Sequence, residues 1–268
     1  MNENKHADEC KESTQELHRY SRMTRYVLLN SLACYTTSKK LHSFLEKLMY
    51  HELDYITEVV NILLRIFRAD FDKIIDIGNS PDSEIEYAQF LLSRCKLLCL
   101  EPTCSSFFLA CAFLCNLILR NGEIIECFRI LYICEFCFLV LHRRLFWKIF
   151  NSKDDYWKLQ KFCDEFCKSF TMDSTLSELQ KTTVGANWIN NLKGCVDATQ
   201  VNFYLDFVDL KLFEDDYSKV NRMECKWDHL REIENMLFPR CESRIESFCN
   251  YCESKCYKYL AHANQFKF

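Results

Sequence analysis

The fold is decided by a long apolar stretch in the middle of the chain, FFLACAFLCNLIL at residues 107–119. A second apolar stretch, ILYICEFCFLVL, follows at residues 130–141. In the helix that we expect over residues 124–141, apolar side chains cover nearly the whole circumference, which is typical of a helix with neighbours on most sides. Each stretch is well below the roughly 20 residues that a helix needs to cross a bilayer. We therefore expect two core helices rather than membrane spans.

Helical periodicity extends to both sides of this centre. Residues 17–77 repeat apolar side chains at steps of three and four, most clearly at residues 55–71. Further helices are expected at residues 84–99 and 197–212 and, in one or two charged pieces, at residues 227–259. The chain has only 4 Gly and 3 Pro, too few for the tight turns and corners of β architectures. The sequence therefore predicts an all-α helical bundle.

Helix boundaries are marked by a few polar and turn-forming residues. The segment GNSPDSE at residues 78–84 combines Gly, Pro and a predicted N-cap, Ser83, so we place a boundary there. Ser105 is expected to cap the next helix, and RNGE at residues 120–123 to turn the chain. The predicted organisation is a disordered polar segment at 1–16, an N-terminal helical segment at 17–80, a helical domain at 81–220 and charged C-terminal helices at 221–268.

Charge and cysteine usage limit the compartment and the partners. The chain has 34 Lys and Arg against 38 Asp and Glu, spread along its length, which argues against nucleic-acid and anionic-membrane partners. The 18 cysteines accompany a polar amino terminus without the pattern of a secretory signal. Many have helical spacing, as in Cys111 and Cys115 or Cys163 and Cys167. We expect reduced cysteines that pack as small hydrophobic residues in the cytoplasm or nucleus.

One group of residues has the spacing of a metal site: Cys241, Cys249, Cys252 and Cys256, with His262 beyond them. A Cys-x2-Cys pair can bind one zinc ion. However, a second Cys-x2-Cys pair and the usual glycine turn are missing, and steps of three and four also form a helix face. We therefore expect core packing and predict no metal and no cofactor, with structural zinc as the second interpretation.

The sequence motifs of common enzymes are missing. None of the patterns GxxxxGK[ST], GxGxxG, HExxH or GxSxG occurs. A nucleophilic cysteine needs a nearby histidine, and with 18 Cys and 7 His such pairs arise by chance. We therefore expect no catalytic residues and a protein that is not an enzyme.

Three segments carry a resemblance to a known family. The first, IEYAQFLLSRCKLLCLEPTCSSFFLACAFLCNLIL at residues 85–119, reads as two helices joined by a loop. The second, FRILYICEFCFLVLHRR at residues 128–144, is expected to form a buried helix. The third, TQVNFYLDFVDLKLF at residues 199–213, is expected to form another helix. In this order they resemble the first, second, central and fifth helices of a divergent cyclin box, most like the short phosphate-pathway cyclins. The resemblance implies a single five-helix core within residues 81–220, with extra N- and C-terminal helices.

This resemblance also implies a function and a binding site. The central helix of a cyclin ends in a lysine that contacts the kinase, and Arg143 or Arg144 takes that place, with Trp147 and Asp209 nearby. A cyclin-like protein would bind and regulate a cyclin-dependent protein kinase, with a role in the cell cycle. Taken alone, the arginines are typical of a helix carboxyl end and the tryptophan of a core. The alternative function is a non-enzymatic helical scaffold or assembly protein without a kinase partner.

Overall fold

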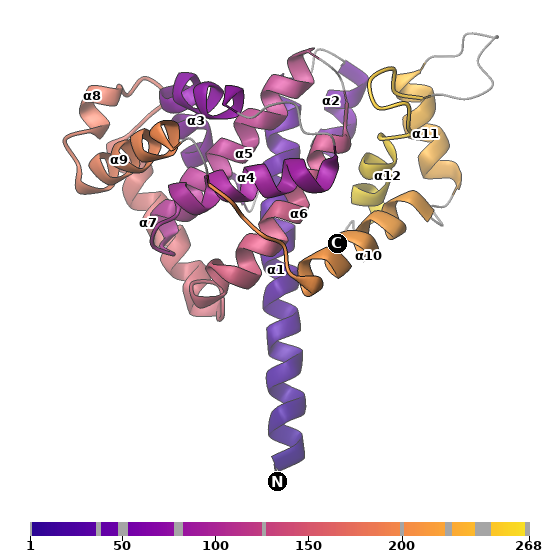
Figure 1. Cartoon of the computed structure of the whole chain (residues 1–268), viewed down its shortest axis with the longest axis horizontal. Helices are drawn as coiled ribbons and strands as arrows, with labels where there is room; N and C mark the ends of the chain where they lie inside the picture. Colours follow the sequence, from indigo (N-terminus) through magenta and orange to yellow (C-terminus); the bar gives the residue numbers. More distant parts are fainter. Residues whose placement is uncertain are drawn as a thin grey trace.

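The computed structural model describes the chain apart from residues 1, 36–38, 48–52, 78–82, 125–126, 199–200, 223–226, 239–247 and 266–268. The protein is about 80% helical, with no strand among the described residues, which confirms the predicted all-α class. Figure 1 shows the helices, which are α1 (Asn2–Tyr35), α2 (Lys39–Glu46), α3 (Asp54–Asp76), α4 (Glu84–Leu98), α5 (Cys104–Ile124), α6 (Arg129–Arg144), the 3-10 helix η2 (Phe146–Lys148), α7 (Lys153–Ser169), α8 (Leu176–Leu179), α9 (Thr183–Asp197), α10 (Phe207–Arg222), α11 (Trp227–Leu237) and α12 (Lys258–Gln265).

Helices α5 and α6 lie at the centre of the bundle. α5 packs against α1 and α3, and α6 packs against α1 and α4. Every residue of the stretch 107–119 on α5 is buried, and so is every residue of 130–138 on α6. By length and composition the window Cys104–Asn121 of α5 could cross a membrane, but 78% of it is buried inside the protein. The prediction of two core helices at this centre is therefore confirmed.

Helix α1 begins much earlier than the sequence indicated. We expected disorder over residues 1–16, whereas α1 is helical from Asn2. The physical reason is that the first glycine of the chain is Gly78 and the first proline is Pro81, so neither of the two strong helix breakers occurs in the amino-terminal segment. Figure 1 shows the amino-terminal part of α1 projecting from the bundle, while its later turns lie among the other helices.

Among the described residues, one hydrophobic core includes side chains from both sides of residue 81, from Tyr20 on α1 to Ala263 on α12. α3 packs against α5 and α7, and α12 packs against α6 and α10. Polar contacts reinforce the α3–α5 interface: the Asn116 amide donates to Asp72 at 2.9 Å, and Arg120 pairs with Asp76 at 2.5 Å. The predicted boundary residues 78–82 themselves lie outside the described residues.

The predicted helix ends are correct at one position and wrong at another. Ser83 caps α4 as predicted, because its hydroxyl accepts a hydrogen bond from the Glu86 amide at 3.2 Å. Ser105 does not cap α5, which starts one residue before it. There the Thr103 hydroxyl accepts from the Ser106 amide at 3.2 Å, the geometry of an N-cap. Both residue types cap well, so the sequence alone could not choose between them.

Two further expectations about loops are wrong. The turn expected at residues 120–123 lies inside α5, whose helix tolerates a glycine in its last turn. The helix expected at residues 197–212 is interrupted, since residues 201–206 are not helical. In this segment Phe203 is buried and Tyr204 is exposed, an alternation that suits extended chain. Figure 1 shows the segment running from the region of α9 to the start of α10.

Candidate functional site

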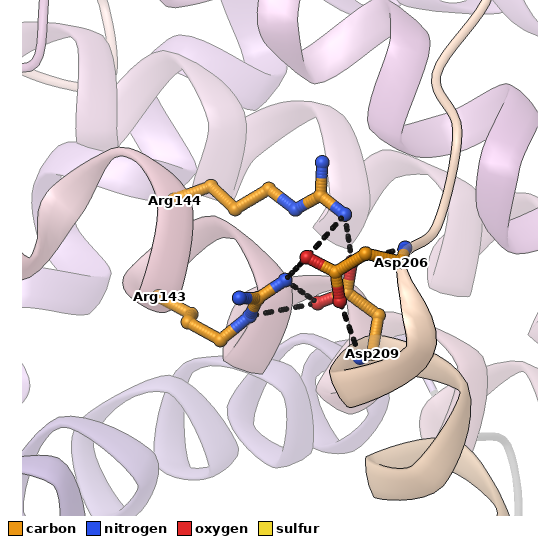
Figure 2. A network of polar contacts seen from close by, with 4 residues as sticks. All are labelled: Arg143, Arg144, Asp206 and Asp209. Carbon is orange, nitrogen blue, oxygen red and sulfur yellow. Dashed lines mark hydrogen bonds and ion pairs between the residues drawn. The ribbon is translucent and has the colours of Figure 1, made fainter.

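The best-defined polar site joins the end of α6 to the start of α10. It consists of Arg143, Arg144, Asp206 and Asp209, which we call the Arg–Asp cluster (Figure 2). The Arg143 guanidinium donates to one oxygen of Asp209 at 2.9 and 2.6 Å, and Arg144 donates to the other oxygen. Arg143 also donates to Asp206, and Arg144 lies 3.4 Å from the same carboxylate. Each arginine therefore contacts both carboxylates.

The two aspartates also begin helix α10. The Asp209 amide donates to the Asp206 carboxylate at 2.9 Å, and the Asp206 amide donates to the Asp209 carboxylate at 3.2 Å. This reciprocal pair is a capping box, which satisfies two backbone amides at a helix start. Carboxylates are favoured at the amino end of a helix and arginines at the carboxyl end. The cluster therefore complements the dipoles of both helices.

Burial assigns the members of the cluster different roles. The Asp209 side chain has no exposed surface, while both arginines are partly exposed. The hydrogen bond from Arg143 holds the pKa of the Asp206 carboxyl below its usual value. Arg144 also lies over the Phe203 ring, 4.9 Å from its centroid. The structure therefore brings Arg143, Arg144 and Asp209 together, but as an internal junction in which Asp209 cannot touch a partner directly.

The fourth predicted site residue, Trp147, lies on η2 just after α6. Its side chain is 47% exposed, so it is not the core residue that composition favours. The Lys148 ammonium stands 5.6 Å from its ring. Trp147 is not a member of the Arg–Asp cluster. It remains available as a surface aromatic residue on the connection that follows Arg144.

Sequence reasoning missed the exposed apolar side chains beside the Arg–Asp cluster. They are Tyr204, Phe207 and Val208, which we call the 204–208 patch; Tyr204 is 73% and Phe207 79% exposed. The helix predicted over residues 197–212 did not distinguish exposed from buried side chains in this segment. The available signal was the Asp-x-x-Asp spacing of residues 206 and 209, which is compatible with a helix start at residue 207.

A second group of side chains gathers between the start of α6 and the segment before α12. The sulfur atoms of Cys127, Cys249, Cys252 and Cys256, which we call the cysteine cluster, all lie within 4.8 Å of one another. The expected helix-face packing of the last three is wrong, because residues 248–257 form turns rather than a helix. Cys127 was missed, since it is remote in sequence and no spacing rule links it to the others.

His262, the last residue of the predicted metal group, does not join the cysteine cluster. Cys241 lies outside the described residues. His262 is on α12, where burial lowers its pKa to about 4, and its charged neighbours include Arg25 and Glu135. That glutamate accepts hydrogen bonds from Arg25 of α1 and Tyr259 of α12. His262 therefore lies beside a buried polar network that joins α1, α6 and α12.

Many of the remaining cysteines are packing residues, as their helical spacing predicted. Cys95, Cys111 and Cys134 are free and fully buried. Burial raises the pKa of each of these thiols well above its usual value. A thiol with a raised pKa is a poor nucleophile at neutral pH, because the thiolate is the reactive form.

The fold and these sites define the chain as an all-α helical bundle with a buried ion-pair junction and a four-cysteine cluster. No protein-family model matches it, and no curated protein and no solved structure is significantly similar to it.

Proposed function

We propose that this protein is a non-catalytic regulatory subunit that binds a protein kinase of the cyclin-dependent type. The kind of partner comes from the resemblance of residues 85–213 to a divergent cyclin box. The single observation that carries the proposal is the 204–208 patch, an exposed aromatic and aliphatic surface beside the predicted site residues Arg143 and Arg144. The predicted contact with Asp209 is indirect in this proposal, since Asp209 positions the patch instead of touching the partner.

The 204–208 patch has the composition of an interface anchor. Tyrosine and other aromatic residues dominate the binding energy of protein interfaces. Exposed apolar side chains grouped beside polar residues mark interaction surfaces more often than isolated ones do. Within the patch, Tyr204 and Phe207 flank Asp206, whose carboxylate is bound by Arg143 and Arg144.

The Arg–Asp cluster supports binding by holding this surface in one conformation. Association costs the conformational freedom of every group that it orders, so a surface ordered in advance binds more tightly. Phe203 contributes to the same effect, because its ring is buried on the core side and lies under Arg144. The backbone of the patch is therefore anchored on both sides of Tyr204, by Phe203 before it and by Asp206 after it.

Kinase regulation requires no chemistry from this chain. A protein that binds the catalytically ordered state of a kinase more tightly than the disordered state shifts the population toward the ordered state. Kinases have a mobile helix that carries a catalytic glutamate. The position of this helix commonly decides whether the kinase is active. In our proposal the 204–208 patch, Trp147 and the exposed edges of Arg143 and Arg144 make this contact.

Affinity purification of the tagged full-length protein from its own cells tests the proposal, with mass spectrometry and a kinase assay on the eluate. The variant Tyr204→Ala/Phe207→Ala removes both aromatic side chains of the patch without touching the Arg–Asp cluster. Trp157→Ala is the matched control, because Trp157 is an aromatic residue of similar exposure on α7. We expect a stoichiometric cyclin-dependent kinase with the wild type and the control, and at least a tenfold loss with the double variant.

Two other outcomes contradict the proposal. A reproducible set of partners that contains no kinase would overturn the kinase assignment in favour of a helical scaffold. Kinase binding that survives the double variant would remove the 204–208 patch from the interface. Arg144→Glu is a poor probe, because it would place a third carboxylate next to the buried Asp209 and disturb the fold itself.

A further inference from the structure

We infer that the cysteine cluster binds one structural zinc ion, which fastens the carboxyl-terminal segment to the start of α6. Four thiolates without an open position form the ligand set of a closed structural zinc site. This site is separate from the proposed kinase interface and does not depend on it.

The geometry of the cysteine cluster fits a single ion. A tetrahedral zinc site with bonds of about 2.3 Å separates its sulfur atoms by roughly 3.8 Å. All the sulfur atoms of the cluster lie within 4.8 Å of one another, so small side-chain rotations bring them to that spacing. The ligands come from two regions remote in sequence, Cys127 from one and Cys249, Cys252 and Cys256 from the other. Such convergence is not expected from helix periodicity.

Backbone amides surround the cluster in the manner expected around metal-bound sulfur. The Arg129 amide faces the Cys127 sulfur, and the amides of Tyr251 and Cys252 face the Cys249 sulfur. Hydrogen bonds of this kind stabilise negative charge on thiolates and orient metal ligands. The Cys252 sulfur also lies 3.9 Å from the Ser254 carbonyl, to which its thiol donates. The amides near Cys127 and Cys249 would stabilise these two sulfur atoms as metal-bound thiolates.

The turn that carries Cys249 and Cys252 has a residue in the left-handed backbone conformation, although it contains no glycine. Glu253 directly follows the Cys-x2-Cys pair and adopts φ 50°, the left-handed region that glycine usually supplies. The Glu253 amide donates to the Cys249 carbonyl at 2.9 Å, and the Cys249 amide donates to the Ser254 carbonyl at 3.0 Å. A non-glycine residue in this region is strained, and such strain persists where the surroundings require it.

Two helix starts lie next to the cluster. Cys127 stands two residues before α6, and Cys256 stands two residues before α12. The positive end of a helix dipole favours a thiolate and lowers its proton affinity. Lys255 and Lys258 flank Cys256 in the sequence and add positive charge near a site that would carry net charge of about −2 with zinc bound. Positive charge therefore lies near the cluster, where it would offset the negative charge of a zinc tetrathiolate.

The position of the site explains what the ion would do. The carboxyl-terminal segment buries Tyr257, Tyr259 and Leu260 against the rest of the bundle. A crosslink between residues that are remote in sequence stabilises the folded chain mainly by restricting the unfolded one. Zinc at the cluster would thus hold α12 on α6, where Tyr259 reaches Glu135.

Metal analysis of the full-length protein, purified without chelator and without a histidine tag, tests the inference. We expect one equivalent of zinc per chain. The variant Cys252→Ser should lose most of the metal, whereas Cys34→Ser, which changes an exposed cysteine outside the cluster, should retain it. Cobalt exchanged into the wild-type protein should show the charge-transfer and visible absorption of a tetrahedral tetrathiolate site.

If Cys252→Ser does not fold, the cobalt spectrum still tests the inference, because this spectrum is recorded on the wild-type protein alone. Removal of zinc by a chelator should also expose residues 248–265 to limited proteolysis before the rest of the bundle. Wild-type protein that folds without metal, that contains iron, or that has a disulfide within the cluster would overturn the inference. Equal zinc content in Cys252→Ser and wild type would do so as well.

Discussion

Gly185 lies against the backbone of Leu179, so closely that a Cβ added at Gly185 would stand 2.0 Å from the Leu179 carbonyl oxygen. This contact packs the first turn of α9 onto the end of α8. Gly194, in the last turns of the same helix, has no atom within 4 Å of such a Cβ. The two glycines therefore lie in one helix but have opposite steric surroundings.

We predict that Gly185→Ala and Gly194→Ala change stability in opposite directions. The first should destabilise the protein by about 1–3 kcal/mol, because the backbone must move apart. The second should stabilise it by about 0.5–1 kcal/mol, because alanine restricts the unfolded chain and favours helix. Urea unfolding followed by circular dichroism measures both. A Gly185→Ala protein as stable as the wild type would show that α8 and α9 do not approach so closely.

The Arg–Asp cluster predicts a graded response to loss of its two carboxylates. Asp209→Ala leaves Arg143 and Arg144 without their buried partner and should cost about 3 kcal/mol, the lower end of the range for a broken buried pair since the arginines are partly exposed. Asp206→Ala removes an exposed carboxylate and an N-cap, and it should cost clearly less than Asp209→Ala. Unfolding midpoints of the two variants give the order, and equal losses would contradict the burial difference between them.

Much of the fold could be predicted from sequence because apolar periodicity is a local property. The central stretches 107–119 and 130–141 and the amphipathic helix at residues 55–71 follow directly from the spacing of their apolar residues. Helix ends were less predictable, since Thr103 and Ser105 cap equally well. The amino-terminal segment differed because polarity predicts exposure, whereas only glycine and proline interrupt a helix strongly.

The sites were harder to predict because they depend on contacts between remote residues. The sequence brought Arg143 and Arg144 together with Asp209 only through a family resemblance, and it placed the aspartate on a surface. It identified Cys249, Cys252 and Cys256 as a ligand set together with Cys241 and His262, but it did not include Cys127. Cys127 is far away in sequence, so only the packing of the carboxyl-terminal segment on α6 reveals it.

We predict a third effect on stability at Arg94, because this residue joins α4 to the end of α9. Its guanidinium is buried and donates to the carbonyl oxygens of Cys195 at 3.1 Å and Ala198 at 2.8 Å. Arg94→Met keeps much of the side-chain volume but leaves both carbonyls without this donor, and should cost about 2–3 kcal/mol. Arg65→Met, which changes an exposed arginine of α3, should cost less than about 0.5 kcal/mol. Similar unfolding midpoints for both variants would refute this role of Arg94.

We predict that His142 makes the stability of the protein fall as the pH falls. Its ring lies 4.6 Å from that of Tyr20, and its Nε2 is buried without a hydrogen-bond partner. Burial lowers the pKa of His142 from 6.5 to about 4, although a hydrogen bond with the Phe150 backbone opposes the shift. The unfolded chain therefore binds a proton at a pH where the folded chain does not. The stability contributed by neutral His142 is complete above about pH 6.5 and is lost as the pH falls toward 4.

The variant His142→Gln isolates this contribution, because all other titrating groups remain. Between pH 7 and pH 5 the wild type should lose more unfolding free energy than the variant, by an amount on the order of 1 kcal/mol after allowance for the partial exposure of the ring. His42→Gln, at an exposed histidine of α2, should follow the wild-type curve. Urea unfolding at a series of pH values measures the difference. If the wild type and His142→Gln lose stability in parallel, the imidazole titrates equally in both states and is not held neutral by burial.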